Sequence, residues 1–473
     1  MGNPNIPLDI LESLKTIVGS NNYVDNPEQM AAYINDIWGQ HHGVTPLILK
    51  PTNTEMASLI VALCNKHNIG VVPQGGNTGL VGGSIPSESG VEIILSMERM
   101  NKVLDIDPIN YTMTVEAGCI LSEVQDVAFA ANRLFPLSLG AEGSCQIGGN
   151  LSTNAGGTAV LRYGNAKELV LGLEVVLPNG NIYHGLRSLR KDNTGYDLKQ
   201  LFLGSEGTLG IITKAVLKLF PLATDTVTSL VALSSLEAAP KLLATLREVT
   251  GDNITAFEYM DRTCVDMLER HADLPDPFGQ TYHHFSLVEL TSSRSDAGLQ
   301  SLLERVFETM VAEGNVVDAV VATSKSQAAQ LWKMREMLPE VYRLQGGGLT
   351  FDISVPVSRV PEFIKQATKS CNQAYKGGTV LTFGHIGDGN VHFIFMKPEN
   401  VSMDDFLLGT NNVSNLIYDI IAEFDGSFSA EHGIGRVKKH ELEHYKSEVE
   451  LKLMRAIKNA IDPNNIINPG KML

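Results

Sequence analysis

Short apolar stretches alternate with helical patterns and glycine-rich turns through the first half of the chain. Apolar positions recur at helical spacing over residues 8–37, and residues 46–50 have an extended pattern. Residues 54–67 predict an amphipathic helix capped by Asn53 or Thr54, and a short strand follows over residues 70–73. Further strands are predicted over residues 91–95, 112–115, 171–177 and 210–213. This order indicates a mixed α/β first half.

The pattern changes after Phe220-Pro221, where the density of glycine falls. Longer helical patterns then alternate with strands, and helices are predicted over residues 236–250 and 297–314. A last helix is predicted over residues 448–461 and is ended by Asp462-Pro463, because the residue before a proline disfavours the helical conformation. We therefore place a domain boundary near Pro221.

Composition and charge narrow the function classes. The 473 residues are 43% hydrophobic and 19% charged, which predicts a chain that folds throughout into two or three domains. The formal net charge of -16 excludes nucleic acid and anionic lipid as expected partners. An acidic enzyme with an anionic substrate must concentrate positive charge locally, in Arg, Lys or a metal ion.

The five cysteines are far apart and include no C-x-x-C pair, so we predict that they are reduced and mostly packed in the core. The N-terminal residues lack the basic and apolar regions of a signal peptide, and no apolar run is long enough for a membrane span. The predicted location is the cytoplasm or the periphery of a membrane.

Two long glycine loops and one short one carry the candidate cofactor chemistry. Residues 73–84 place five glycines within nine residues directly after a predicted strand. Such a loop can turn successive N–H groups toward a pyrophosphate, although an ordinary tight turn is the alternative. The loop matches neither a Walker A motif nor G-x-G-x-x-G. Residues 136–157 and 204–212 are also glycine-rich, and two long loops predict a large cofactor.

Histidines and one carboxylate form a candidate metal site. His385 and His392 are seven residues apart around Gly-Asp-Gly. On a straight strand this spacing would put them on opposite faces, so a common ligand requires that the glycine turn fold the segment back. Glu431 lies in another glycine-flanked loop and completes a ligand set that suits zinc. The pattern alone leaves ordinary structural histidines as an alternative.

These motifs together resemble the FAD-binding family of vanillyl-alcohol oxidase and p-cresol methylhydroxylase, in its D-2-hydroxyacid dehydrogenase branch. The resemblance runs from about His42 to the C-terminus and also includes the terminal Asn-Pro-Gly-Lys over residues 468–471. It implies an α+β fold: a two-part FAD-binding PCMH-type domain over residues 1–221, a substrate (cap) domain with an antiparallel sheet flanked by helices over 222–425, and a segment over 426–473 that returns to the FAD domain.

The resemblance also implies which residues bind FAD. In this family the cofactor is usually bound without a covalent bond. The first loop would hold the pyrophosphate, and the second loop and third motif would line the cofactor. The implied residues are Pro73, Gly75, Gly76, Asn77, Thr78, Gly79, Ser84, Gly140, Ser144, Gly148, Gly149, Asn150, Thr153, Asn154, Gly157, Gly207, Ile212, Asn390 and Asn468.

The reaction implied is the oxidation of a D-2-hydroxy acid to the 2-keto acid, with hydride transfer to flavin N5. His385, His392 and Glu431 match the zinc ligands of the family. His432 is the candidate general base, with a hydrogen-bonding role as its alternative. Arg335 matches the arginine that binds the substrate carboxylate, with a solvated helical charge as its alternative.

Three positions depart from the 2-hydroxyglutarate enzymes of this family. Pro339, Thr350 and Ile394 stand where those enzymes have polar partners for a second carboxylate. We therefore expect a shorter or less polar D-2-hydroxy acid. The alternatives are a D-2-hydroxyglutarate dehydrogenase that uses other residues, a noncatalytic FAD-binding subunit of an oxidase complex, and a sugar or alcohol oxidase. A quinone or an electron-transfer flavoprotein is the expected external electron acceptor, and the family favours a homodimer.

Overall fold

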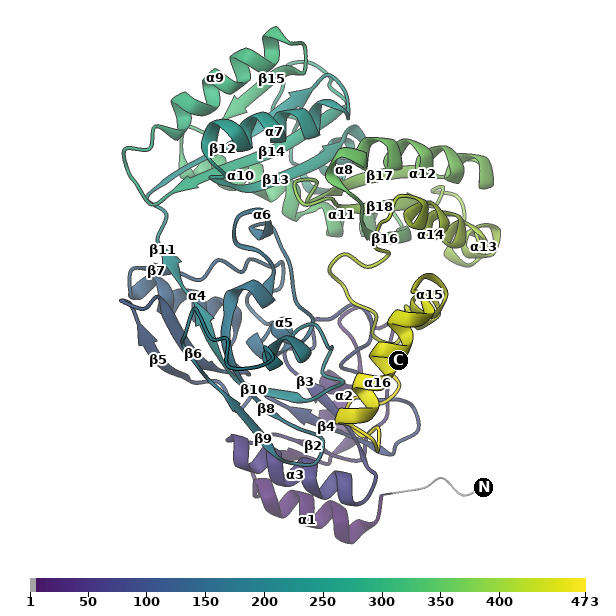
Figure 1. Ribbon diagram of the computed structural model, residues 1–473. Helices are drawn as coiled ribbons and strands as arrows, with labels where there is room; N and C mark the ends of the chain where they lie inside the picture. The colour runs from purple at the N-terminus through teal and green to yellow at the C-terminus, as the bar shows by residue number, and fades with distance from the viewer. Residues whose placement is uncertain (1–5) are drawn as a thin grey trace. The chain divides into compact units, whose positions relative to one another are not determined.

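The structure is a computed structural model that describes residues 6–473, and its helices and strands form two compact units (Figure 1). The first unit comprises Met1–Gly156, Gly164–Leu222 and Glu431–Leu473, and the second comprises Gly157–Tyr163 and Ala223–Ala430. The chain therefore leaves the first unit twice. The predicted α+β class is confirmed, because helices pack on sheets that are largely antiparallel.

A small sheet at the start of the first unit carries the first glycine loop. Its strand order is β1-β2-β4-β3, with β1 (Tyr23–Val24), β2 (Ile48–Leu49), β4 (Glu92–Ser96) and β3 (Gly70–Gln74). The helices of this region are α1 (Leu8–Val18), α2 (Pro27–Ile34) and α3 (Thr54–Lys66). The Asn53 side chain caps α3 through the Met56 N–H, as predicted. The segment over residues 8–37 differs from the prediction, because β1 pairs with β2 and separates two helices.

The second sheet of this unit is antiparallel, with the order β5-β6-β10-β8-β9. Its strands are β5 (Val103–Asp107), β6 (Thr112–Glu116), β10 (Ile211–Lys218), β8 (Val170–Val176) and β9 (Ile182–Gly185). A two-stranded ladder pairs β7 (Arg133–Leu134) with β11 (Phe220–Pro221). The helices here are α4 (Leu121–Ala130), α5 (Ile147–Ser152), η1 (Ala166–Leu169) and η2 (Leu198–Leu201).

The C-terminal segment completes the first unit. It forms α15 (Lys439–Tyr445) and α16 (Glu448–Ile461), and α16 has the bounds predicted for the last helix. Ser447 and Glu450 form a capping box at the start of α16. After α16 the chain runs beside β3, where Ile467 forms a parallel bridge with Val71. The tail thus lies next to the strand that leads into the first glycine loop.

The second unit is built on one antiparallel sheet of seven strands in the order β15-β12-β14-β13-β17-β18-β16. The strands are β12 (Asp225–Leu233), β13 (Ile254–Asp261), β14 (His284–Ser292), β15 (Val316–Val321), β16 (Gly348–Ser354), β17 (Thr379–Gly384) and β18 (Asn390–Met396). The helices are α6 (Val160–Tyr163), α7 (Ala238–Thr250), α8 (Arg262–Ala272), α9 (Leu299–Ala312), α10 (Lys325–Glu336), α11 (Leu338–Leu344), η3 (Val357–Arg359), α12 (Val360–Ala374), α13 (Met403–Gly409) and α14 (Val413–Glu423).

The cores explain why these elements hold together. One core cluster of the second unit packs α8, α10 and α11 against the sheet through residues such as Leu268, Met334, Leu338 and Ile394. All five cysteines are buried, which confirms the prediction that they are packed in the core. None of the helices among residues 6–473 combines the length and apolarity that crossing a bilayer would require.

Candidate active site

The first glycine loop offers a row of backbone donors in the first unit. The N–H groups of residues 75–79 have no hydrogen-bond acceptor among the residues that the structure describes. Asn77 has a φ of 54°, and its side-chain amide donates to the carbonyls of Ala32 at 3.1 Å and Asn35 at 2.8 Å. Its Oδ1 accepts from the Ser84 hydroxyl at 2.8 Å. Asn77 therefore anchors the loop while consecutive N–H groups remain for an anion such as a diphosphate.

The pocket beside this loop fits a large ligand with hydrogen-bond donors. A Cβ atom at Gly76 would lie 2.0 Å from the Ser144 carbonyl oxygen, so only glycine allows the first two glycine loops to approach this closely. Gln146 Oε1 and Asn150 Oδ1 line the pocket, are buried, and have no hydrogen-bond partner within the described part of the chain. Buried amide oxygens normally accept a hydrogen bond. The N–H and O–H groups of FAD would supply the missing donors.

Most residues predicted to bind FAD line this pocket, but some do not. Gly140 is exposed, the Asn154 side chain accepts from the Lys167 N–H, and Gly157 and Asn390 belong to the second unit. Those in the pocket lining are Pro73, Gly75, Gly76, Asn77, Thr78, Gly79, Ser84, Gly148, Gly149, Asn150, Thr153, Gly207 and Ile212. Those outside it are Gly140, Ser144, Asn154, Gly157, Asn390 and Asn468.

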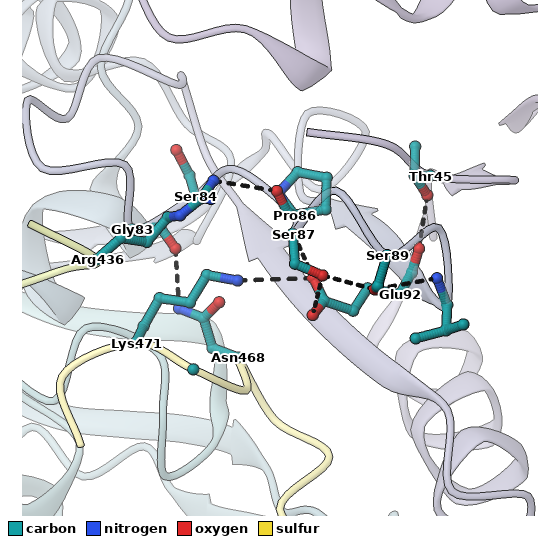
Figure 2. A network of polar contacts seen from close by, with 12 residues as sticks. Thr45, Gly83, Ser84, Pro86, Ser87, Ser89, Glu92, Arg436, Asn468 and Lys471 are labelled. Carbon is teal, nitrogen blue, oxygen red and sulfur yellow. Dashed lines mark hydrogen bonds and ion pairs between the residues drawn. The ribbon is translucent and has the colours of Figure 1, made fainter. Parts of the chain in front are cut away.

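The C-terminal tail contacts the first glycine loop, and Figure 2 shows Asn468 hydrogen-bonded to Gly83. The Asn468 side-chain amide donates to the carbonyls of Gly83 at 3.0 Å and Glu206 at 2.9 Å. Lys471 is buried, and its Nζ lies 3.7 Å from a carboxylate oxygen of Glu92. Burial lowers the pKa of Lys471, and the Glu92 carboxylate opposes that shift. Asn468 is thus a support for the loop rather than part of the pocket lining.

Glu206 connects the third glycine motif to the segment that contains His432. Its carboxylate oxygens accept from the N–H groups of Ile434 and Gly435, each at 2.7 Å. Both Glu206 and His432 line the cofactor pocket. Burial raises the pKa of Glu206, although the two backbone donors favour its charged form. His432 Nε2 lies 3.5 Å from Glu431 Oε1, so this short segment holds an imidazole and a carboxylate together.

The two predicted metal-ligand histidines come from one hairpin of the second unit. β17 and β18 pair with Phe383 opposite His392, and the turn between the strands contains His385. At Gly389, φ is 88° and a Cβ atom would lie 2.2 Å from the Val355 carbonyl oxygen. The predicted folding back at the glycine turn is therefore confirmed. The two imidazole centroids are 5.7 Å apart.

Glu431 directly follows a segment that is hydrogen-bonded to β16. The Ala430 N–H donates to the Asp352 carbonyl on β16, and Glu431 follows directly. The ligand atoms of His385, His392 and Glu431 all lie within 4.8 Å of one another. Two imidazoles and one carboxylate at this spacing suit a divalent metal such as zinc and leave a coordination position for substrate.

A fully buried carboxylate, Glu258 on β13, connects this cluster with the predicted substrate arginine. Glu258 Oε1 lies 2.6 Å from His385 Nδ1, and Oε2 accepts from Arg335 Nε at 2.6 Å. Burial by itself would raise the pKa of Glu258, but His385 and Arg335 hold it at about 2. The Arg335 guanidinium also lies over the Phe383 ring, 4.8 Å from its centroid. Arg335 is therefore a buried, paired cation and not a solvated helical charge.

Comparison with known proteins agrees with this arrangement. Residues 45–185 match the FAD binding domain, and residues 222–472 match the C-terminal domain of FAD linked oxidases. The second match covers more than half of the chain. The protein belongs to the FAD-linked oxidase family. The resemblance drawn from the sequence motifs is therefore confirmed, and FAD is the cofactor that these matched domains support.

The similarity of this FAD-linked oxidase to named relatives covers nearly all of the chain. A protein of Oryza sativa subsp. indica named probable D-2-hydroxyglutarate dehydrogenase, mitochondrial, is 37% identical over 98% of this chain and 82% of its own length. The Danio rerio D-2-hydroxyglutarate dehydrogenase, mitochondrial, is 40% identical over 91% of this chain and 79% of its own length. The fold is that of p-cresol methylhydroxylase, whose structure matches with a TM-score of 0.76 at 17% identity over 98% of this chain and 96% of that one.

The sequence motifs did not reveal several residues that shape the site of this FAD-linked oxidase. Asn390 Nδ2 donates to Asp352 Oδ1 at 2.9 Å, and the same carboxylate oxygen lies 3.9 Å from His392 Nδ1. Asp352, Gln146, Glu206 and Glu258 were therefore not predicted as site residues, whereas Asn390 and His392 were. For Glu258 a signal existed, since it is a charged residue inside β13 with apolar neighbours on both sides. A charge inside a buried strand requires a partner.

Proposed function

We propose that this FAD-linked oxidase oxidises a D-2-hydroxy acid to the 2-keto acid, with FAD as hydride acceptor and a divalent metal, zinc first, held by His385, His392 and Glu431. The observation that carries this proposal is the cluster of two imidazoles and one carboxylate within 4.8 Å. The names of relatives at 37–40% identity support the substrate class and its stereochemistry.

Arg335 is our proposed ligand for the substrate carboxylate. Only Nε of its guanidinium is paired with a described side chain, and the partner is Glu258. The two Nη groups form no side-chain hydrogen bond among residues 6–473. Their planar arrangement suits a carboxylate that accepts two parallel hydrogen bonds. A substrate held there would present its 2-hydroxyl group in a defined orientation.

His432 is our proposed general base. It lines the cofactor pocket and directly follows Glu431, which belongs to the metal-ligand set. An imidazole accepts a proton near neutral pH and can remove the proton of the 2-hydroxyl group. Glu206 holds the backbone next to this imidazole through Ile434 and Gly435. A bound metal would lower the pKa of the substrate hydroxyl, and bound FAD would accept the hydride of the α-carbon.

The far end of the substrate is proposed to be short or apolar. Ile394 is fully buried and lies on the same face of β18 as His392, two residues away. It faces Leu381 on β17 and packs in the core cluster with Met334. Pro339, another departure from the 2-hydroxyglutarate enzymes, is exposed. A second substrate carboxylate would have no charged partner from Ile394 or Leu381.

The second candidate is a D-2-hydroxyglutarate dehydrogenase proper, which the relatives' names favour. In that case, side chains other than those at positions 339, 350 and 394 bind the distal carboxylate.

We propose an external quinone or electron-transfer flavoprotein as electron acceptor, because no cysteine cluster is available for a second redox group. A homodimer and a location in the cytoplasm or at the periphery of a membrane complete the proposal, with Asn390 as a residue that orients the metal-ligand region.

Anaerobic reduction of the bound flavin tests this proposal. The purified protein is mixed with D- and L-2-hydroxy acids, including D-lactate, D-2-hydroxybutyrate and D-2-hydroxyglutarate, with and without EDTA. We expect flavin bleaching by one or more D-acids, and its loss after treatment with EDTA. Bleaching by D-2-hydroxyglutarate alone would support the second candidate. Absence of bleaching by every acid would overturn the proposed reaction.

A further inference from the structure

Glu258 is the only described carboxylate that contacts both a proposed metal ligand and the proposed substrate arginine. It comes from the middle of β13, whereas His385 lies in the β17–β18 turn and Arg335 in the last turn of α10. Each of its oxygens has one partner at 2.6 Å. Three elements that are far apart in the sequence therefore meet at one carboxylate.

Each contact fixes a property that the reaction needs. An ionised carboxylate can only accept, so the contact at Oε1 requires a proton on His385 Nδ1 and leaves the Nε2 lone pair for a metal. The contact at Oε2 holds Arg335 by Nε, so its two Nη groups are left for a substrate carboxylate. Rotation of the Glu258 side chain would disturb both groups together.

We propose that Glu258 is a positioning residue that makes metal binding and substrate-carboxylate binding depend on each other. The inference rests on the proposed function for the roles of His385 and Arg335. The bare geometry admits a simpler alternative, in which Glu258 only neutralises the buried Arg335. The two readings differ in one respect, because neutralisation alone predicts no effect on metal affinity.

Zinc affinity of the FAD-loaded protein tests the first half of this proposal. The metal is removed, and zinc is returned in competition with a chromogenic chelator. Glu258→Gln offers one amide oxygen to two donors, so we expect its zinc affinity to fall about 10- to 100-fold. The matched control is Glu289→Gln. Glu289 accepts a hydrogen bond at 2.7 Å from Nε1 of Trp332, which lies on the same helix α10 as Arg335. Glu289 does not contact His385, so the zinc affinity of Glu289→Gln should change less than twofold.

A second pair of variants works even if Glu258→Gln fails to fold with an unpaired Arg335. In the Arg335→Met background the cation beside Glu258 is gone, and Glu258→Gln is compared with Glu258→Leu. The amide oxygen of the first double variant can still accept from His385, whereas the leucine cannot. We expect about 10- to 100-fold weaker zinc binding in the Leu double variant than in the Gln double variant. Equal affinities would overturn the proposal.

The second half is tested with D-lactate as the probe, through the concentration that gives half-maximal flavin reduction. We expect Glu258→Gln to raise this concentration at least tenfold at saturating zinc, because Arg335 loses its anchor. No rise would overturn the coupling. If the wild-type flavin is not reduced by any acid, the proposed function fails, while the zinc measurements still decide the role of Glu258 toward His385.

Discussion

The cofactor pocket of the first unit and the histidine cluster of the second unit depend on different kinds of chemical groups. The pocket depends on backbone N–H groups and on glycines that leave no room for a side chain, as at Gly76. The cluster depends on buried ionisable side chains, each paired with another, as in Arg335, Glu258 and His385. One site is therefore sensitive to added atoms, and the other is sensitive to removed atoms or charges.

The largest expected effect comes from removing an imidazole in the second region. His385→Ala should lower the turnover number by about a thousandfold or more, because metal-assisted polarisation supplies several kcal/mol. The variant should keep its flavin, since the proposed pyrophosphate loop belongs to the first unit. Turnover, zinc content and flavin absorbance are measured together. The exposed His440→Ala is the control, and full activity in a metal-free His385→Ala variant would contradict the metal mechanism.

Adding one methyl group should break the first region. Gly76→Ala would place Cβ 2.0 Å from the Ser144 carbonyl oxygen, a backbone atom that can move only with its loop. We expect purified Gly76→Ala to contain little FAD, as measured by the absorbance ratio of flavin to protein. Gly143→Ala is a matched control in the facing loop, because Gly143 is outside the pocket lining and nothing lies within 4 Å of its Cβ position. Equal flavin content in both variants would show that close packing of the loops is not required.

A conservative change at Arg335 sharpens the second side of the comparison. Arg335→Lys keeps a positive charge beside Glu258 but lacks the planar fork. Loss of one charged hydrogen bond of about 1.5–3 kcal/mol should raise KM roughly 10- to 100-fold, with a smaller change in kcat. Steady-state kinetics with the preferred acid measure this effect. Arg343 is exposed and pairs with Glu340, so Arg343→Lys serves as the control and should leave KM unchanged. An unchanged KM in Arg335→Lys would remove Arg335 from the substrate site.

The smallest effect concerns stability and a buried carboxylate outside the proposed ligand set. Burial raises the pKa of Asp261 to about 6, although the N–H groups of Cys264 and Thr382 donate to it. A carboxylate with a raised pKa in the folded state contributes stability below about pH 4 that is lost as the pH rises through 6. Relative to Asp261→Asn, the wild type should therefore lose about 3 kcal/mol between pH 4 and 7. Denaturant unfolding of both proteins measures the difference, and parallel curves would contradict it.

Prediction from sequence succeeded where the signal was local. The strand that ends before Gly75, the helix capped by Asn53 and the last helix ended by Asp462-Pro463 follow from spacing, capping and proline chemistry within a few residues. The prediction failed over residues 8–37, where β1 interrupts the helical pattern. That interruption depends on β2, a partner strand more than twenty residues later.

By itself, the sequence of this protein indicated several of its helices, strands and glycine loops, and which histidines and carboxylates could serve as ligands. Only the tertiary structure decided that Glu206 holds the segment after His432 and that Glu258 joins His385 to Arg335. These contacts join residues 77 to 229 positions apart in the chain. Their partners are selected by strand order and burial, because a buried charge is stable only where the fold brings a donor to it.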